Sequence, residues 1–284
     1  MLKANLDYFA PASLREAVDA LGHYGEKARV LAGGTDLLIA LQKEATTCNT
    51  LVDIGRIDEI KEIKKDGPYL AVGAAVPFSD IISHPLVMEV APLLVQASLE
   101  VGSPQIRNRG TIGGNLGTAS PAGDLLTPLT ALEAEIVVVG LAGRRRTPVG
   151  KFLGGGDRER LQPYEIISEV WIPLPGSGET RSAFIKLGRR KALAISRLNL
   201  ALYLEMQGQN IAKARMAVGA AGPFPFRIAG AEQSLVKSGV NAAEIMKQVS
   251  RAVADSLGDR PSAQYKTIAV KGLVLEALSK CGLD

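Results

Sequence analysis

The alternation of apolar and polar residues divides the chain into three successive segments with different mixtures of helices and strands. The opening segment has Ser13 and Glu16 at capping-box spacing, and apolar residues then recur at helical spacing as far as Leu21. Short apolar runs flanked by glycines follow and predict strands. The expected order is a helix from residue 14, a strand at 28–31, a helix at 36–42, a strand at 51–54, and a hairpin within 60–74 that turns at Asp66 and Gly67.

The middle segment is dominated by apolar helices and by hairpins. Residues 85–101 predict a helix with a kink at Pro92, because proline cannot donate the backbone hydrogen bond at that point. Residues 102–121 contain five glycines, two prolines and two arginines, and they predict a long binding loop. Beyond it we expect a helix at 124–132, a hairpin formed by 135–139 and 145–149, a glycine-rich surface loop at 154–156, and a strand at 166–172.

The closing segment has strands first and helices afterwards, which is typical of an α+β domain. Prolines and glycines at 173–178 predict a domain boundary before it. We therefore predict domains at 1–57, 58–176 and 177–284. In the last of these we expect three strands at 182–188, 198–206 and 211–219, followed by helices at 227–237, 241–257 and 263–280.

Composition supports an ordinary globular protein. Of 284 residues, 46% are hydrophobic and 22% are charged, so disorder is not favoured. No apolar run reaches the roughly 20 residues that a membrane span needs, and the N-terminal residues lack the apolar core of a secretion signal. We therefore expect a cytoplasmic protein without a membrane span.

Charge and cysteine content narrow the possible partners. The net charge of +4 suggests an anionic partner, but the dense basic clusters at 144–146 and 189–191 have no interleaved aromatic residues for stacking on bases. Nucleic-acid binding is therefore not expected. Cys48 and Cys281 are the only cysteines, and neither belongs to a metal-binding pattern. We expect no iron–sulfur cluster and no metal in this chain.

The first candidate binding motif is Ala32-Gly33-Gly34-Thr35-Asp36, which comes between a predicted strand and a predicted helix. Backbone N–H groups in such a turn can bind phosphate, and glycines allow a close approach. The motif is neither GxGxxG nor a P-loop, so the usual dinucleotide and nucleoside-triphosphate folds are disfavoured. An ordinary Gly-Gly turn remains the alternative.

The second candidate motif is Thr111-Ile112-Gly113-Gly114-Asn115, continued by Ser120 and by Asp124 at the next helix start. Its glycines offer backbone amides, and its hydroxyl and amide side chains offer neutral hydrogen bonds to phosphate or ribose. The alternative is an Ω-loop that binds nothing, with Asp124 as a helix cap. His23 and His84 have no partner pattern for metal or nucleophilic chemistry, so any chemistry is expected to reside in a cofactor.

The sequence resembles a known family, the FAD-binding medium subunits of molybdenum hydroxylases such as xanthine dehydrogenase and carbon monoxide dehydrogenase. Four segments carry the resemblance in family order and spacing: Ala32 to Asp36, Val101 to Leu116, Ser120 to Asp124, and Phe184 to Arg190. The likeness covers essentially the whole chain. It implies an α+β fold in which a two-lobed FAD-binding domain of the vanillyl-alcohol-oxidase-like (PCMH) type precedes a C-terminal α+β domain.

The resemblance also implies site residues. Both glycine motifs would hold the diphosphate of a noncovalently bound FAD, Asp124 would lie near the flavin ring, and Lys186 would approach the ring and stabilise anionic reduced flavin. Lys186 is therefore the expected catalytic residue. The expected cofactor-binding residues are Leu31, Ala32, Gly33, Gly34, Thr35, Asp36, Thr111, Ile112, Gly113, Gly114, Asn115, Ser120, Asp124, Ile167 and Lys186.

The family resemblance implies partners as well. A large subunit would carry molybdopterin, a small subunit would carry [2Fe-2S] clusters, and this chain would pass their electrons to NAD or another acceptor. One departure concerns the acceptor: the acidic residues that follow the paired arginines in animal xanthine dehydrogenases are replaced by Lys191 to Ser196 here. The alternative function is a self-standing FAD-dependent oxidase or reductase of the same fold.

Overall fold

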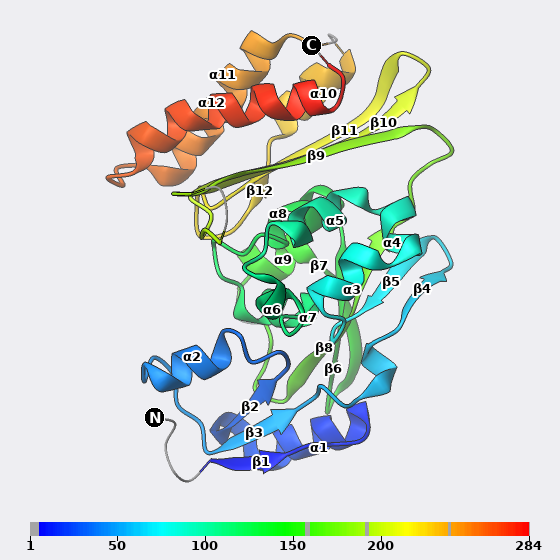
Figure 1. Cartoon of the computed structure of the whole chain (residues 1–284), viewed down its shortest axis with the longest axis vertical. Coiled ribbons are helices and arrows are strands. Elements are labelled where there is room, and N and C mark those ends of the chain that lie inside the picture. Colours follow the sequence, from blue (N-terminus) through cyan, green and yellow to red (C-terminus); the bar gives the residue numbers. More distant parts are fainter. Residues whose placement is uncertain (1–5, 157–159, 191–192, 238–239, 284) are drawn as a thin grey trace.

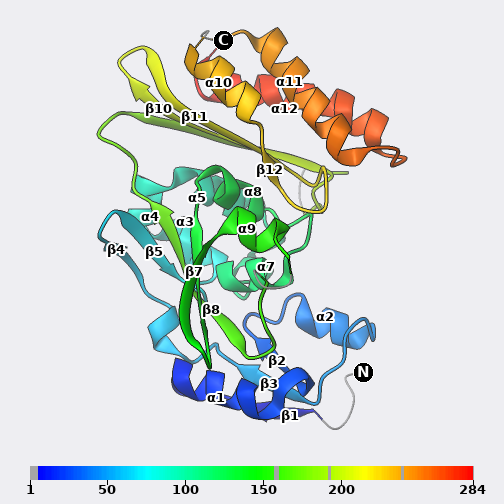
Figure 2. The same cartoon turned by 180° about the vertical axis from the view of Figure 1, so that it is seen from behind.

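The computed structural model describes residues 6–156, 160–190, 193–237 and 240–283, and it contains three sheets that follow one another along the chain (Figure 1). Lys191, which belongs to the second basic cluster, lies outside the described residues. The first sheet lies at one end of the molecule, the second in the middle, and the third at the other end beneath the C-terminal helices (Figures 1 and 2). None of the helices in the described ranges combines the length and apolar character needed to span a bilayer.

The first lobe is a parallel three-stranded sheet in the order β1-β3-β2. Parallel neighbours require crossover connections, and helices supply them here. The expected cap forms in a shifted version: the Ser13 hydroxyl accepts from the Glu16 N–H at 3.2 Å, whereas the Glu16 carboxylate accepts from the N–H of Ala12, the residue before the cap, at 2.9 Å. The elements are β1 (Asp7–Phe9), α1 (Leu14–Tyr24), β2 (Ala28–Leu31), α2 (Leu37–Gln42) and β3 (Thr50–Asp53), with short 3-10 turns at Gly25–Lys27 and Asp58–Ile60.

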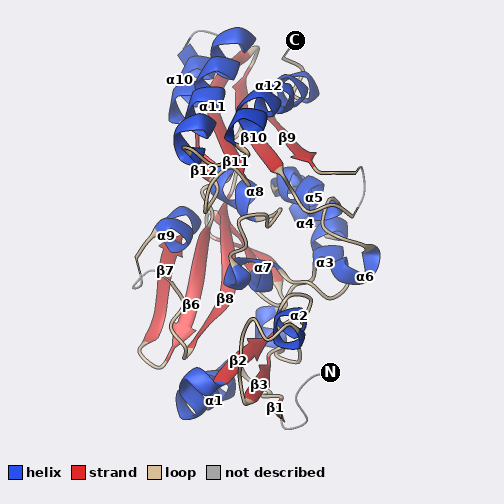
Figure 3. Cartoon of the chain, turned by 90° about the vertical axis from the view of Figure 1, so that its left-hand side faces the viewer, coloured by secondary structure: helices blue, strands red, loops and turns tan. Residues whose placement is uncertain are grey.

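The second lobe is an antiparallel five-stranded sheet covered on one face by short helices (Figure 3). The expected hairpins are present, and Ile167, Val170 and Ile172 of the central strand β8 are buried in the core that this sheet shares with the helices. The helices α3 and α9 were not expected from the sequence, and neither were the two within residues 102–121 that are described below. The strands are β4 (Ile63–Asp66), β5 (Tyr69–Gly73), β6 (Glu135–Gly140), β7 (Gly143–Pro148) and β8 (Glu165–Pro173), and the helices include α3 (Phe78–Ser83), α8 (Leu126–Ala131) and α9 (Val149–Gly154).

The expected kinked helix is two helices. α4 (Pro85–Val90) ends before Ala91, and α5 (Pro92–Leu99) starts at the proline. Ala91 has φ −134° and ψ 56°, outside the helical region. The residue before a proline is sterically pushed out of the α conformation, so the chain interrupts the helix instead of bending it.

Residues 102–121 are not the open loop that their glycine content predicted. They contain two short helices, α6 (Pro104–Arg107) and α7 (Ile112–Thr118). Each helix is capped by a hydroxyl: Ser103 accepts from the Ile106 N–H at 3.3 Å, and Thr111 accepts from the Gly114 N–H at 3.0 Å. The caps and the buried side chains of α7 offset the low helix propensity of its glycines.

The C-terminal domain is an antiparallel sheet with three helices on its outer face (Figures 1 and 2). The sheet has four strands among the described residues instead of the three expected, because Phe226 and Arg227 pair with β11 before the helix begins. The elements are β9 (Thr180–Leu187), β10 (Leu198–Gln207), β11 (Asn210–Gly219), β12 (Phe226–Arg227), α10 (Ala229–Lys237), α11 (Ala242–Leu257) and α12 (Ala263–Lys280).

The inner face of this third sheet packs on α5 and α8 of the second lobe. The Gln96 side chain joins the two units, since its Nε2 donates to the Ser182 carbonyl at 3.2 Å and its Oε1 accepts from the Phe184 N–H at 2.8 Å. The Thr127 hydroxyl contributes a further bond to Asn199 Oδ1 at 2.6 Å. The predicted domain boundaries at residues 57 and 176 stay a proposal. The packed junction joins the second lobe and the C-terminal domain through shared core residues and hydrogen bonds.

An ion-pair cluster around Glu133 strengthens the junction. Its carboxylate pairs with Arg215 and Arg227 of the C-terminal domain, and Lys213 lies 3.9 Å away. Burial alone would raise the pKa of Glu133, but the arginine charges and hydrogen bonds outweigh it, so the pKa is lowered. This carboxylate therefore contributes stability above the pKa of an unfolded glutamate, and the contribution is lost as pH falls through the lowered folded pKa.

We expect Glu133→Gln to destabilise the protein at pH 7 and to flatten the decline of stability between neutral pH and about pH 3. The physical reason is that glutamine does not titrate, so residue 133 no longer makes a pH-dependent contribution to the free energy of unfolding. Thermal unfolding midpoints of both proteins across this range measure the effect. Parallel curves for the two proteins would show that the ion pairs around residue 133 do not contribute.

Candidate cofactor-binding site

A cavity of about 1180 Å³ lies between the first two lobes and extends to residues 193–195 of the C-terminal domain. Ordinary small-ligand sites measure roughly 300 to 1,000 Å³, so this cavity suits a larger ligand of dinucleotide size. It is bordered by the β2–α2 turn, by α7, by the 120–124 turn and by β8. The site is thus formed by segments that are distant in sequence.

Most of the residues expected from the sequence reach this cavity. Leu31, Ile112 and Lys186 do not line it: Leu31 ends β2, Ile112 belongs to the core of the second lobe, and Lys186 lies behind Asp124. The twelve that line the cavity are Ala32, Gly33, Gly34, Thr35, Asp36, Thr111, Gly113, Gly114, Asn115, Ser120, Asp124 and Ile167.

The β2–α2 turn offers free backbone donors. The N–H groups of Gly33, Gly34 and Thr35 have no acceptor among the described residues, so they are available to a phosphate. Gly34 has φ +75°, a left-handed conformation that glycine adopts without strain. Gly33 is needed for a different reason from the expected one: a Cβ there would lie 1.8 Å from the carbonyl oxygen of Arg109. Its missing side chain makes room for the second lobe, not only for a ligand.

The second motif differs from its expected role, because its first amides are already bonded within the protein. The N–H of Ile112 donates to Val76 O at 3.2 Å, that of Gly113 to Ala74 O at 2.9 Å, and that of Gly114 to the Thr111 hydroxyl. These amides do not form an anion nest. Gly117 instead leaves a bare patch on the helix surface, since a Cβ there would have only Leu161 Cδ1 within 4 Å, at 3.9 Å.

Asn115 supplies an observation that fits a bound flavin nucleotide. Its Oδ1 atom is buried in the cavity wall and has no hydrogen-bond partner among the described residues. A buried acceptor without a donor is costly, and the hydroxyl and N–H groups of FAD are donors of the required kind. The unpaired Oδ1 of Asn115 and the free amides of Gly33 to Thr35 offer an acceptor and donors to a ligand, so the residues present fit FAD.

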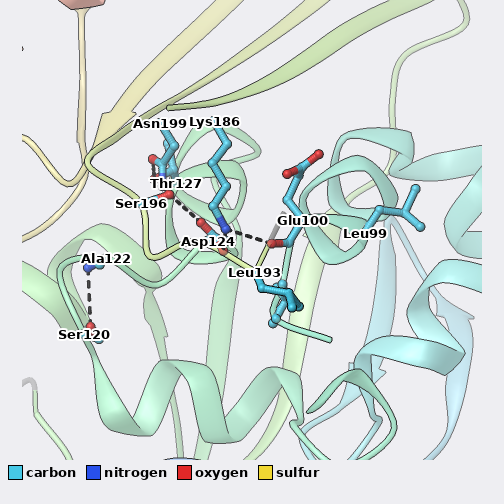
Figure 4. Close-up of polar contacts among 12 residues, drawn as sticks. Leu99, Glu100, Ser120, Ala122, Asp124, Thr127, Lys186, Leu193, Ser196 and Asn199 are labelled. Atoms are coloured by element: carbon cyan, nitrogen blue, oxygen red, sulfur yellow. Dashed lines mark hydrogen bonds and ion pairs between the residues drawn. The ribbon is translucent and has the colours of Figure 1, made fainter. Parts of the chain in front are cut away.

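Asp124 and Lys186 form a buried ion pair at the end of the cavity nearest the C-terminal domain (Figure 4). Lys186 Nζ donates to Asp124 Oδ2 at 2.6 Å and to the Glu100 carbonyl at 2.7 Å, and its side chain is 5% exposed. The other carboxylate oxygen of Asp124 accepts from the Ser196 hydroxyl at 2.7 Å. Lys186 therefore contacts Asp124 instead of the cavity itself.

The protonation of Asp124 reflects opposing effects. Burial raises its pKa, whereas the charge and hydrogen bond of Lys186 and the bond from Ser196 lower it, and the net direction is upward. Asp124 lines the cavity, so it is the member of the network that can contact a ligand. Lys186 would act on a ligand through Asp124, as a positioning residue.

Sequence patterns missed several lining residues, because these carry no motif and come from ordinary loops. Arg29, Thr46 and Thr47 extend the cavity along the first lobe, and Ile106 lines it near α6. Others are Val101, Gly102, Gly110, Leu161, Gln162, Pro163 and Glu165, together with Leu193, Ala194 and Ile195. Val101, Gly102, Ile106 and Gly110 did have a signal, since they lie in the segment of 101–121 that was predicted as a binding loop and that carries the resemblance.

We expect Gly117→Leu to remove FAD binding while the protein stays folded. The new side chain would project from α7 into open space in the cavity, where it would exclude the ligand. Gly272→Leu is the matched control, because Gly272 also lies within a helix with nothing near its missing Cβ but is not part of the cavity. Gly114→Val should likewise lose FAD, although its Cβ would also press on Thr111 Oγ1 at 3.0 Å. Flavin absorbance after reconstitution is the measurement, and normal flavin content in Gly117→Leu would refute this placement of the ligand.

Comparison with known proteins finds a described family for the FAD-binding part of the chain and another for its C-terminal domain. Residues 4–175 match the family described as FAD binding domain in molybdopterin dehydrogenase, and residues 183–281 match the CO dehydrogenase flavoprotein C-terminal domain. The nicotinate dehydrogenase FAD-subunit of Eubacterium barkeri is 34% identical over 95% of this chain and 93% of its own length. The carbon monoxide dehydrogenase medium chain of Hydrogenophaga pseudoflava is 32% identical over 98% of each chain.

Solved structures agree with these relatives. A chain of carbon monoxide dehydrogenase from Hydrogenophaga pseudoflava superposes with a TM-score of 0.88 at 31% identity, covering 99% of both chains. A chain of quinoline 2-oxidoreductase from Pseudomonas putida 86 gives a TM-score of 0.88 at 27% identity and covers 98% of both chains. The expected two-part fold is confirmed by these neighbours. The chain belongs to the family of FAD-binding subunits of molybdenum hydroxylase-type dehydrogenases, and it is the flavoprotein component of an oxidoreductase.

Proposed function

We propose that this chain is an electron relay, which receives electrons from iron–sulfur clusters of a small partner subunit and passes them to NAD or another acceptor. The substrate would be oxidised at molybdopterin on a large partner subunit. The bound flavin supplies the capacity to take up electrons singly or in pairs. The chain's own part is to bind the diphosphate with the amides of Gly33 to Thr35, to shape the cavity with α7, and to hold Asp124 at its end.

The observation that carries this proposal is that two carboxylates in a cavity of cofactor size are already bonded to other side chains. Asp124 is bonded to Lys186 and Ser196, and Glu165 is paired with Arg145 at 2.8 Å. A self-standing oxidase needs an acid–base group with free access to its substrate. Neither of these two carboxylates is free for that work. The other carboxylates that line the cavity, Glu26 and Asp36, belong to the first lobe, where the diphosphate is proposed to bind. This arrangement favours a relay over the self-standing enzyme.

Partners are supported by the relatives. The names of several describe one part of an assembly, such as the medium chain of carbon monoxide dehydrogenase and the alpha subunit of the 6-hydroxypseudooxynicotine dehydrogenase complex of Paenarthrobacter nicotinovorans. Within the described residues no group of three or more His, Cys, Asp or Glu side chains is placed to hold a metal. We therefore propose that molybdopterin and the [2Fe-2S] clusters belong to the partner subunits.

The test compares the purified flavin-loaded chain with the assembled complex. We expect acid precipitation to release all the flavin, because no histidine or cysteine that could form a covalent flavin linkage is among the residues that line the cavity. We also expect the isolated chain to be reduced by dithionite or NADH, yet to leave purines and nicotinate unoxidised until the large and small subunits are added. Rapid-mixing absorbance measures each half-reaction. Flavin retained on the denatured chain would contradict the binding mode, and substrate turnover by the chain alone would identify a self-standing flavoenzyme.

A further inference from the structure

A row of polar side chains leads from the domain junction to Asp124 at the end of the cavity (Figure 4). The Thr127 hydroxyl donates to Asn199 Oδ1 at 2.6 Å, and Asn199 Nδ2 donates to the Ser196 hydroxyl at 3.3 Å. Ser196 in turn donates to Asp124 Oδ1 at 2.7 Å. This polar row therefore connects α8, which contains Thr127, with a carboxylate that lines the cavity.

The polar row is shielded from water along its whole length. Asn199 is fully buried, Thr127 is nearly so, and Ser196 and Asp124 are 6% and 8% exposed. Buried amides and hydroxyls are costly unless they are bonded, and apolar side chains of similar size fill such a position without that requirement. Packing of the junction therefore does not by itself explain why this row is polar.

The register of the third sheet determines where the Asn199 side chain lies. Asn199 of β10 is directly paired with Lys186 of β9 and with Gly219 of β11. Directly paired residues share a face of the sheet, so Asn199 and Lys186 project side by side toward the second lobe. A Cβ on Gly219 would lie 2.0 Å from Thr127 Oγ1 and 2.3 Å from Asn199 Oδ1. The glycine thus leaves the space that the bond between Thr127 and Asn199 occupies.

The hydrogen bonds of the row run in one direction, and this determines where the Ser196 proton points. A serine hydroxyl has a single proton to donate. Since Asn199 Nδ2 donates to Ser196 Oγ, the hydroxyl proton is left for Asp124. Asp124 then accepts from Ser196 at Oδ1 and from Lys186 at Oδ2. Donors on both oxygens stabilise the ionised form of a carboxylate.

The charge of Asp124 is governed by the groups that surround it. Burial raises its pKa most, the charge and hydrogen bond of Lys186 on β9 lower it, and the charge of Glu100 at the end of α5 raises it. The helices that flank it in sequence, α7 and α8, contain no titratable side chain. The bond from Ser196 also lowers the pKa, so loss of that bond would raise the pKa further.

We propose that Asn199 is a positioning residue that acts through Ser196 to keep Asp124 ionised, and, resting on the proposed function, that it thereby sets the reduction potential of the bound flavin. An ionised Asp124 neutralises Lys186, whereas a protonated Asp124 leaves a net positive charge at this end of the cavity. Positive charge beside the ring favours the negative charge that flavin gains on reduction. The polar row therefore holds the potential lower than it would be without the Ser196 bond.

The test measures the midpoint potential of the flavin in the FAD-loaded full chain between about pH 8 and about pH 5. Titration with dithionite against a reference dye gives the potential of the parent, Ser196→Ala and Asn199→Leu. We expect equal potentials at the alkaline end, where Asp124 is ionised in every protein. On acidification the variants should shift the equilibrium toward reduced flavin by about tenfold, which is about 30 mV for a two-electron couple. The double variant should show no larger shift than Ser196→Ala, because Asn199 acts through Ser196.

Two further variants separate this role from a loss of stability. Ser250→Ala is the matched control: the Ser250 hydroxyl is buried in α11 and donates to the Thr267 carbonyl at 2.9 Å, and it does not line the cavity. We expect this control to follow the parent at every pH. Thr127→Val keeps the shape of the side chain but removes the donor to Asn199, so it serves if Asn199→Leu does not fold. It should give a smaller shift in the same direction.

Parental potentials at every pH in Ser196→Ala and Thr127→Val would overturn the proposal. A lower free energy of unfolding with an unchanged potential would overturn it as well, since that result describes a purely structural contact. Shifts that add in the double variant would show that Asn199 does not act through Ser196. The proposed function is tested separately by substrate turnover of the chain alone, because that result does not depend on the potentials of these variants.

Discussion

Replacing Gly33 by alanine is expected to separate the first lobe from the second and to abolish flavin binding. The new Cβ would lie 1.8 Å from Arg109 O and 2.9 Å from Gly110 N, and both are backbone atoms that cannot rotate away. The two lobes must move apart, which we expect to cost about 3 kcal/mol or more of unfolding free energy. The cavity would open at the same time, because Gly33 and Gly110 both line it.

Chemical denaturation and flavin titration measure the two consequences. Gly150→Ala is the matched control, since Gly150 is exposed in α9 and nothing lies within 4 Å of its missing Cβ. We expect the control to be neutral or slightly stabilising, as alanine is the better helix former. If Gly33→Ala retained parental stability and flavin content, the close contact between the lobes would not be part of the folded protein.

Removing one partner of the buried Asp124–Lys186 pair should have a comparable effect. Lys186→Met would leave a carboxylate that is 9% exposed with only the Ser196 hydroxyl as partner, and such losses cost about 3 to 5 kcal/mol. The double variant Asp124→Asn with Lys186→Met should recover much of this loss, because no unpaired charge remains buried. Unfolding free energies of the four proteins give the coupling between the two side chains.

The pH dependence separates this explanation from a simple packing defect. Burial already raises the pKa of Asp124, and loss of the lysine would raise it further. A folded-state pKa above the unfolded value means that the folded protein takes up a proton as pH falls, so acid stabilises it relative to the unfolded chain. Lys186→Met should therefore approach the parent in stability on acidification. A deficit independent of pH would show that lost packing, and not the stranded charge, causes the effect.

The sequence allowed most of the architecture to be predicted, because apolar periodicity and turn residues identify strands and helices that are regular and long. β8 to β11 and α10 to α12 are of this kind. The short strands β1 and β12 and the helices α3, α6, α7 and α9 were missed. Their conformations depend on partners distant in sequence, such as β11 for β12 and the Val76 and Ala74 carbonyls for α7, and local composition does not report such partners.

The candidate site shows the same limit. Gly33 and Gly113 were identified as phosphate-binding glycines, yet their missing side chains accommodate Arg109 and Ala74. A glycine motif shows that something must come close to the backbone, but it does not show whether a ligand or the protein itself does so. The contact of Lys186 with Asp124 could not be predicted either, since it joins residues separated by 62 positions.

The contact between Ser196 and Asp124 also bears on the order in which the protein matures during synthesis. The wall formed by residues 193–195 is contributed by the C-terminal domain, so both lobes emerge from the ribosome before the cavity is complete. Domains generally fold as units with the N-terminal one first, which leaves the nascent lobes with an open cleft. Stable retention of flavin would then require the chain to extend past residue 195, and a chain truncated before residue 193 is expected to lose its flavin more readily than the full chain.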